Sequence, residues 1–170
     1  MGSLPDLDAT FTDQLGREVR LADLSGKTWL CAFIFTRCAS SCPIMTARMA
    51  QIAEMSKGIP DFRLVSFSVD PIHDTPEVLA RYARQYGADP ERWRFLTGEK
   101  GAIYALARKG FKLGVEKDDT TENIATAFLH SNRFVLVDQR GRIRRYYDST
   151  EADVPERVIA DIGRLAGEGR

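Results

Sequence analysis

The chain lacks most of the features that assign a protein to a class by composition alone. Its 170 residues include only three cysteines and two histidines, too few cysteines for a small domain stapled by disulfides. Lysine plus arginine and aspartate plus glutamate number 24 each, so no net charge draws the chain to nucleic acid or to an anionic membrane. No apolar run reaches the roughly 20 residues that span a bilayer. Any partner must therefore be recognised by a local site.

The sequence also contains no linker, internal repeat or low-complexity tract. Its length and its 44% hydrophobic content suffice for one core, so we expect residues 1–170 to form a single domain. The start, Met1-Gly2-Ser3, has neither the charged nor the apolar region of a signal peptide and resembles a remnant of cloning. We therefore expect that a native anchor or signal has been removed from the N-terminus.

Hydrophobic periodicity predicts strands that alternate with helices. A turn at Gly16 indicates an N-terminal hairpin, and a turn at residues 139–141 indicates a second hairpin over 133–147. Further strands are expected at 28–35, 62–69 and 93–96, and helices at 43–57, 76–87, 101–108 and 154–166. Thr75 is predicted to cap the second helix, with Pro76 in its first position. Residues 115–127 are polar without periodicity and predict an exposed loop.

Two of the three cysteines stand at the predicted turn between the first buried strand and the first helix. Cys38 and Cys42 are separated by three residues, and the positive end of a helix dipole favours the thiolate form. Thiolates bind soft metals and attack disulfides. Cys31, by contrast, lies within a continuous apolar strand and is predicted to be buried and inert.

A thiol pair at this turn, in a central mixed β-sheet flanked by helices, favours a thioredoxin-like α/β fold with an N-terminal hairpin. The spacing is C-x-x-x-C rather than the C-x-x-C of ordinary thioredoxins. The strand that begins near Arg133 is preceded by His130 and lacks the proline that thioredoxins carry at the corresponding strand entry.

These motifs together resemble those of the Sco/SenC family, the copper-handling proteins of cytochrome c oxidase assembly. The resemblance covers nearly the whole chain and includes Phe35-Thr36-Arg37-Cys38, Cys42-Pro43, Ser68-Val69-Asp70-Pro71, Asp74-Thr75-Pro76-Glu77, Leu96-Thr97-Gly98, His130-Ser131 and Phe134-Val135-Leu136-Val137-Asp138. It implies that Cys38, Cys42 and His130 bind copper. Ala39 stands where the family usually has proline; no ligand atom is lost, so we expect an altered affinity or redox poise.

The donor set supports this interpretation on chemical grounds. Two thiolates and one imidazole form a soft, low-coordinate site that suits Cu(I), and the nitrogen donor helps to accommodate Cu(II). Structural zinc would require a fourth protein ligand.

Several residues near the cysteines allow two interpretations. Asp70 either orients His130 as an outer-shell acceptor or caps the turn that follows it. Arg37 either stabilises a thiolate or is solvated, and His73 is either a solvated loop residue or a transient ligand. Met45 and Met49 recur at the spacing of an apolar helix face and are expected to pack in the core rather than bind copper.

The resemblance implies a metallochaperone that passes copper by ligand exchange to the dinuclear copper site of a cytochrome c oxidase subunit, with other copper chaperones as further partners. The alternative is a thiol:disulfide oxidoreductase that reduces the copper-ligand cysteines of that subunit, with Cys38 and Cys42 as the redox pair. A peroxidase is disfavoured, because one residue separates Thr36 from Cys38 where peroxiredoxins have two.

The resemblance also carries an expected location. It implies a native form anchored at the periplasmic face of the bacterial inner membrane or, alternatively, placed in the mitochondrial intermembrane space. The chain without its anchor is expected to be soluble.

Overall fold

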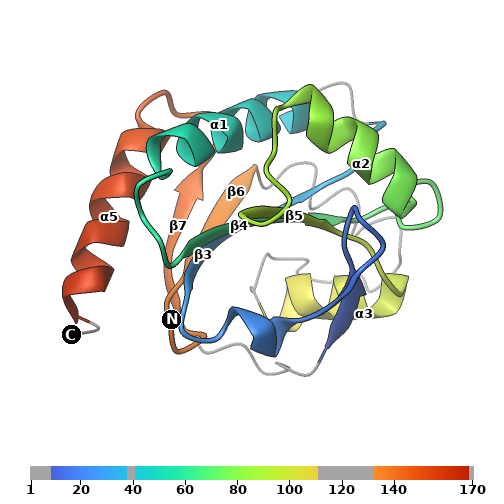
Figure 1. Ribbon diagram of the computed structural model, residues 1–170, viewed down its shortest axis with the longest axis horizontal. Coiled ribbons are helices and arrows are strands. Elements are labelled where there is room, and N and C mark those ends of the chain that lie inside the picture. Colours follow the sequence, from blue (N-terminus) through green and yellow to red (C-terminus); the bar gives the residue numbers. More distant parts are fainter. Residues whose placement is uncertain (1–8, 38–40, 111–131, 169–170) are drawn as a thin grey trace.

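A five-stranded mixed sheet forms the centre of the fold (Figure 1). The computed structural model describes residues 9–37, 41–110 and 132–168, without the side chains of residues 41, 42, 109 and 110. The strand order is β5-β4-β3-β6-β7. Strand β3 (Thr28–Ile34) is parallel to β4 (Phe62–Ser68), and β4 is parallel to β5 (Trp93–Leu96). Strand β6 (Arg133–Val137) is antiparallel to both β3 and β7 (Ile143–Asp148).

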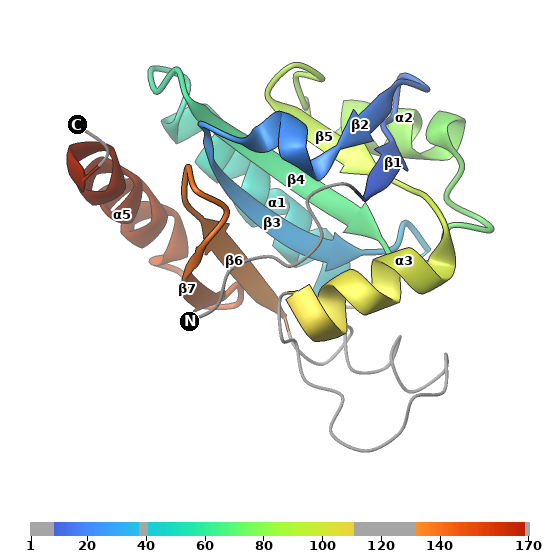
Figure 2. The same cartoon turned by 90° about the horizontal axis from the view of Figure 1, so that it is seen from below.

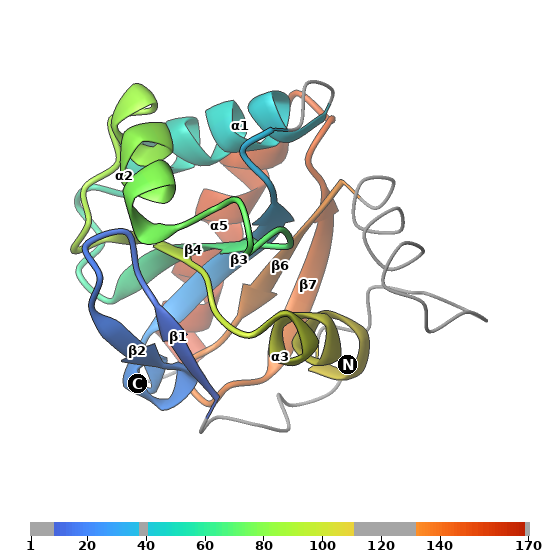
Figure 3. The same cartoon turned by 90° about the vertical axis from the view of Figure 1, so that its right-hand side faces the viewer.

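Helices and a small hairpin cover the two faces of this sheet. Helices α1 (Ser41–Met55), α2 (Pro76–Gln85) and α5 (Val154–Glu168) lie on one face. The other face carries α3 (Lys100–Ala105), its π-helical continuation Leu106–Gly110, the 3₁₀ turn Leu21–Leu24, and the hairpin of β1 (Thr10–Thr12) and β2 (Glu18–Arg20). Figure 3 shows the sheet from the side, between these two layers.

The side-chain alternation of β3 divides the core into two parts. All seven residues of β3 are buried, because both faces of the strand are covered. Leu30, Ala32 and Ile34 belong to the core beneath α1, α2 and α5, whereas Cys31 and Phe33 belong to the core beneath α3 and the hairpin. Because β3 is the middle strand of the sheet, its carboxyl end lies at the centre of the end of the sheet where β3 and β4 finish.

The thioredoxin-like α/β fold and its N-terminal hairpin are as the sequence predicts. Gly16 has φ of 78° in the turn of that hairpin, a conformation that glycine adopts without strain. Thr75 caps α2 as expected, since its hydroxyl oxygen accepts a hydrogen bond from the Val78 N–H at 3.3 Å. The predicted loop at 115–127 lies outside the described residues.

The first helix differs from the prediction at its start. It begins at Ser41, two residues before the predicted Pro43, because a proline is tolerated throughout the first helical turn, where backbone N–H groups have no intrahelical partner. Cys42 is therefore in the first turn of α1 instead of before it.

Candidate metal and redox site

The residues predicted to bind copper lie mostly outside the described part of the chain. Cys38, Ala39 and His130 are not described, and only the backbone of Cys42 is. The structure does describe the neighbouring segments of the chain, which are the end of β3, the first turn of α1 and the loop between β4 and α2. In Figure 2 the carboxyl ends of β3 and β4 lie side by side, next to α3.

A buried carboxylate joins the ends of β3 and β4 directly before the cysteine turn. Asp74 is fully buried, and its Oδ1 accepts a hydrogen bond from the Thr36 hydroxyl at 2.5 Å. Its Oδ2 accepts from the Thr36 N–H at 3.1 Å and from the Ser68 hydroxyl at 2.7 Å. No cation lies within ion-pair distance of Asp74 among the residues described. The network fixes the chain two residues before Cys38.

A second, more exposed cluster consists of Arg37, Asp70 and His73. The guanidinium Nη2 of Arg37 lies 3.0 Å from Asp70 Oδ2, and His73 Nδ1 lies 3.1 Å from Asp70 Oδ1. The same Arg37 nitrogen lies 3.0 Å from His73 Nδ1. A ring nitrogen either donates or accepts, so at any moment His73 hydrogen-bonds to one of these two partners. Arg37 is thus paired with a carboxylate instead of being a freely solvated cation.

The Asp70 carboxyl is held ionised by this cluster. Partial burial alone would raise its pKa, but the hydrogen bonds from His73 and Arg37 outweigh that cost and lower the pKa below its ordinary value. The turn after Asp70 is closed by the main chain, because the Asp70 carbonyl accepts from the N–H groups of His73 and Asp74 at 3.2 and 2.9 Å. The other role predicted for Asp70, the orientation of His130, involves a residue outside the described part of the chain.

Helix α3 contacts the same edge of the sheet through Tyr104. Its hydroxyl donates a hydrogen bond to the Val69 carbonyl at 3.2 Å, directly before Asp70. Burial, together with the nearby negative charge of Asp70, raises the pKa of Tyr104. The end of β4 is therefore held from both faces of the sheet, by α3 on one side and by the Asp74 network on the other.

Three other sulfur-containing side chains, those of Cys31, Met45 and Met49, belong to the core. Cys31 is fully buried in the middle of β3, and this burial raises the pKa of its thiol well above the usual value. Met45 and Met49 are buried against the sheet, and Met49 Sδ accepts a hydrogen bond from the Ser66 hydroxyl at 3.6 Å. These observations confirm the core assignments made for all three residues.

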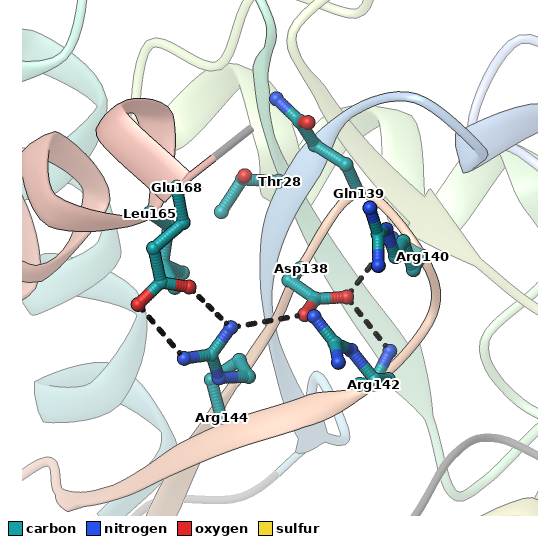
Figure 4. Close-up of a pocket in the computed structure, with 8 residues that line it drawn as sticks. All are labelled: Thr28, Asp138, Gln139, Arg140, Arg142, Arg144, Leu165 and Glu168. Atoms are coloured by element: carbon teal, nitrogen blue, oxygen red, sulfur yellow. Dashed lines mark hydrogen bonds and ion pairs between the residues drawn. The ribbon is translucent and has the colours of Figure 1, made fainter. Parts of the chain in front are cut away.

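A polar cavity, shown in Figure 4, lies at the other end of β3. It has a volume of about 80 Å³ and is lined by Thr28, Asp138, Gln139, Arg140, Arg142, Arg144, Leu165 and Glu168. Asp138 pairs with Arg142 at 2.9 Å and with Arg144 at 3.2 Å, and Arg144 also pairs with Glu168 at 2.8 Å. Because Thr28 is the first residue of seven-residue β3, roughly 20 Å separates this cavity from the cysteine turn. Its paired charges attach the β6–β7 hairpin to α5.

The part of the chain that the structure describes contains no cluster of three or more histidine, cysteine, aspartate or glutamate residues able to hold a metal ion. Within the same residues, no helix has the length and apolar character needed to cross a membrane. The Asp74 network could not be recognised from the sequence. The residue follows His73 in an apparently polar loop, and nothing in its local pattern distinguishes a buried aspartate from a solvated one.

Comparison with known proteins gives consistent results over nearly the whole chain. A model of the SCO1/SenC family matches residues 6–167. The SCO1 protein homolog of Bacillus subtilis (strain 168) is 36% identical over 155 residues, which cover 90% of this chain and 78% of that protein.

Solved structures match equally broadly. A SCO1/SenC family lipoprotein from Bacillus anthracis superposes with a TM-score of 0.82 at 34% identity, over 96% of each chain. BsSco, a Sco protein of cytochrome c oxidase assembly in which a disulfide switch was identified, has a TM-score of 0.76 at 32% identity, over 95% of this chain and 94% of its own. Bradyrhizobium japonicum ScoI, solved with copper bound, has a TM-score of 0.68 at 24% identity, over 92% and 96% of the two chains, and shares the fold.

Proposed function

This chain belongs to the SCO1/SenC family, and we propose that it is a copper-binding metallochaperone that delivers copper to the dinuclear site of a cytochrome c oxidase subunit. In this proposal Cys38, Cys42 and His130 are the ligands, and Cu(I) or Cu(II) is the cargo. The names of the matched relatives, which include an oxidase assembly protein and a Sco protein solved with copper, support the assignment.

The observation that carries the proposal is the place where α1 begins. The helix starts at Ser41 and has 15 residues, so Cys42 belongs to its first turn. Backbone N–H groups there have no intrahelical partners, and the positive end of the helix dipole favours an anion. A cysteine at such a position is favoured as a thiolate, which is the form that binds copper and attacks disulfides.

A low-coordinate site also suits the release of copper. Cu(I) is a soft ion that prefers thiolate ligands, and a two-thiolate, one-imidazole set leaves room for the cysteines of an acceptor to bind before those of the donor leave. The number of ligands also disfavours structural zinc, which normally has four protein ligands where this set has three.

The test is an anaerobic titration of the reduced protein with Cu(I) in the presence of a competing chelator. We expect one copper per chain, and sharply weaker binding in Cys38→Ser, Cys42→Ser and His130→Ala. Cys31→Ala is the matched control, because this third cysteine is fully buried in β3. The assignment fails if the wild type does not bind copper or if Cys31→Ala is as weak as Cys38→Ser.

A second candidate function is a thiol:disulfide oxidoreductase, which the disulfide switch identified in BsSco favours. In that reaction the thiols of Cys38 and Cys42 become a disulfide while the disulfide of the partner becomes two thiols, so two electrons pass to the partner. The two functions separate on one peptide with two cysteines. Copper-loaded protein should transfer metal to the reduced peptide. If instead metal-free protein reduces the oxidised peptide rapidly and the loaded form transfers nothing, the chaperone assignment is wrong.

The location follows the same reasoning. The matched proteins include a bacterial lipoprotein and a SCO2 homolog described as mitochondrial. We propose that the native protein is anchored at the periplasmic face of a bacterial inner membrane, where the copper site of the oxidase would be within reach.

A further inference from the structure

The two residues directly before the cysteine turn are bound by side chains from another segment of the chain, the loop between β4 and α2. Thr36 is bound through both its N–H and its hydroxyl by Asp74, and Arg37 is bound by Asp70. These are the last two residues described before Cys38. The two attachments differ in strength, and the difference can be argued from burial.

The attachment through Arg37 is the weaker one. Its side chain is 60% exposed and that of Asp70 is 22% exposed, and exposed ion pairs contribute little because water screens them. Asp74 is fully buried and accepts three hydrogen bonds. Hydrogen bonds to a buried charged group are among the strongest in proteins, and an unpaired group there is costly. Asp74 therefore dominates the geometry directly before the cysteine turn.

The same carboxylate also connects the loop to which it belongs. The Ser68 hydroxyl donates to Asp74 and accepts from the Asp70 N–H at 3.1 Å. One network thus joins the end of β3, the end of β4 and the start of the loop that carries Asp70 and His73. Hydrogen bonds therefore connect each of these points to Thr36.

We propose that Asp74 is a positioning residue for Cys38, acting through Thr36. By fixing the backbone at the start of the cysteine turn, it sets how readily the Cys38 and Cys42 thiols meet each other. Disulfide formation requires a narrow range of Cα separations and dihedral angles, and a held backbone lowers the entropy lost on reaching them. The inference rests on the proposed function, in which these two cysteines are the reactive pair.

Two substitutions of Asp74 separate position from charge. Asp74→Ala removes all three hydrogen bonds. Asp74→Asn keeps the geometry. The amide oxygen can accept hydrogen bonds from the Thr36 N–H and the Ser68 hydroxyl, and the amide N–H can donate to the Thr36 hydroxyl oxygen, because a hydroxyl accepts as well as donates. If Asp74 acts by position, the asparagine variant resembles the wild type; if it acts by its charge on the thiols, the asparagine variant resembles the alanine variant.

Asp13→Ala is the matched control for general destabilisation. Asp13 is also fully buried, and its carboxylate accepts from the N–H groups of Leu15 and Arg17 and from the guanidinium groups of Arg17 and Arg94. It belongs to the N-terminal hairpin and its contact with β5, away from the cysteine turn. Its loss removes a fully buried, hydrogen-bonded carboxylate without touching Thr36.

The experiment uses metal-free protein, so its outcome does not depend on copper. We would measure the equilibrium of the Cys38–Cys42 disulfide against glutathione, and the alkylation rate of the reduced thiols by iodoacetamide from pH 5 to pH 9. For Asp74→Ala we expect a roughly tenfold change in the disulfide equilibrium constant, in the alkylation rate, or in both. Removal of other residues that orient metal ligands has an effect of similar size. For Asp74→Asn and Asp13→Ala we expect less than about a twofold change.

The proposal is overturned if Asp13→Ala shifts these values as far as Asp74→Ala, because the effect is then general destabilisation. It is equally overturned if Asp74→Asn shifts them as far, or if no variant shifts them. If Asp74→Ala does not fold, Thr36→Val and Ser68→Ala are judged by the same criteria. A wild type that fails to bind copper while Asp74→Ala alone shifts thiol reactivity would refute the proposed function and leave the positioning role intact.

Discussion

The Thr36 hydroxyl offers a quantitative test of the network that precedes the cysteine turn. Thr36→Val keeps the shape of the side chain and the backbone N–H bond to Asp74, but it removes the 2.5 Å hydroxyl bond. A hydrogen bond to a charged group contributes roughly 1.5–3 kcal/mol to folding, and the fully buried Oδ1 of Asp74 would lose its donor. We therefore expect Thr36→Val to lower the free energy of unfolding by about 2 kcal/mol. For a chain of this length that corresponds to roughly 4–8 °C in Tm.

A double-mutant cycle shows whether this cost belongs to the contact. In an Asp74→Ala background the hydroxyl has no carboxylate to donate to, so Thr36→Val should cost less than about 0.5 kcal/mol. The expected coupling energy is then roughly 1–2.5 kcal/mol, within the range for residues in direct contact. Urea unfolding of the four proteins, monitored by tryptophan fluorescence, gives the values from midpoints and m-values. Additive effects, with a coupling energy near zero, would refute the structural reasoning.

Three further predictions concern other parts of the molecule. In reduced native protein, two thiols should react rapidly with a thiol reagent and the third only on unfolding, because Cys31 is buried with a raised pKa. Arg37→Ala should lower the free energy of unfolding by less than about 1 kcal/mol, since its pair with Asp70 is partly exposed, and a larger loss in urea unfolding would contradict this. Burial raises the pKa of Asp138, but hydrogen bonds from Arg142, Arg140 and Arg144 outweigh it and hold the pKa below its usual value. Its stabilising contribution is therefore present above the unfolded-state pKa and lost as pH falls through the folded-state pKa, so Asp138→Asn should flatten the loss of stability below about pH 4.

Much of the fold could be predicted because the chain follows local rules closely. The continuous apolar run of β3 predicts a strand covered on both faces, and all its residues are buried. Thr75 and Pro76 mark the start of α2 by capping chemistry that depends on neighbouring residues alone. Such features need no knowledge of distant contacts.

The surroundings of the cysteine turn could be predicted only in part. Asp74 and Thr36 are 38 residues apart, and their contact depends on the parallel pairing of β3 with β4, which places the two strand ends together. The pairing of Arg37 with Asp70 depends on the same register. Local sequence indicates that these residues are polar, whereas only the sheet determines which of them meet and which become buried.

The sequence positions of the proposed ligands suggest an order for copper release. Cys38 and Cys42 are four positions apart in the sequence. Asp74 binds Thr36, two residues before Cys38, and Cys42 is in the first turn of α1. His130 comes from a different segment, three residues before the start of β6 at Arg133. Loss of the imidazole leaves two thiolates from a single short turn, a coordination that a soft ion such as Cu(I) accepts. Loss of either thiolate first would leave one sulfur and one nitrogen from separate segments, a poorer site for the same ion. On the proposed ligand set, we therefore expect exchange with an acceptor to begin at His130, while the Cys38 and Cys42 thiolates hold the copper until the thiolates of the acceptor have bound.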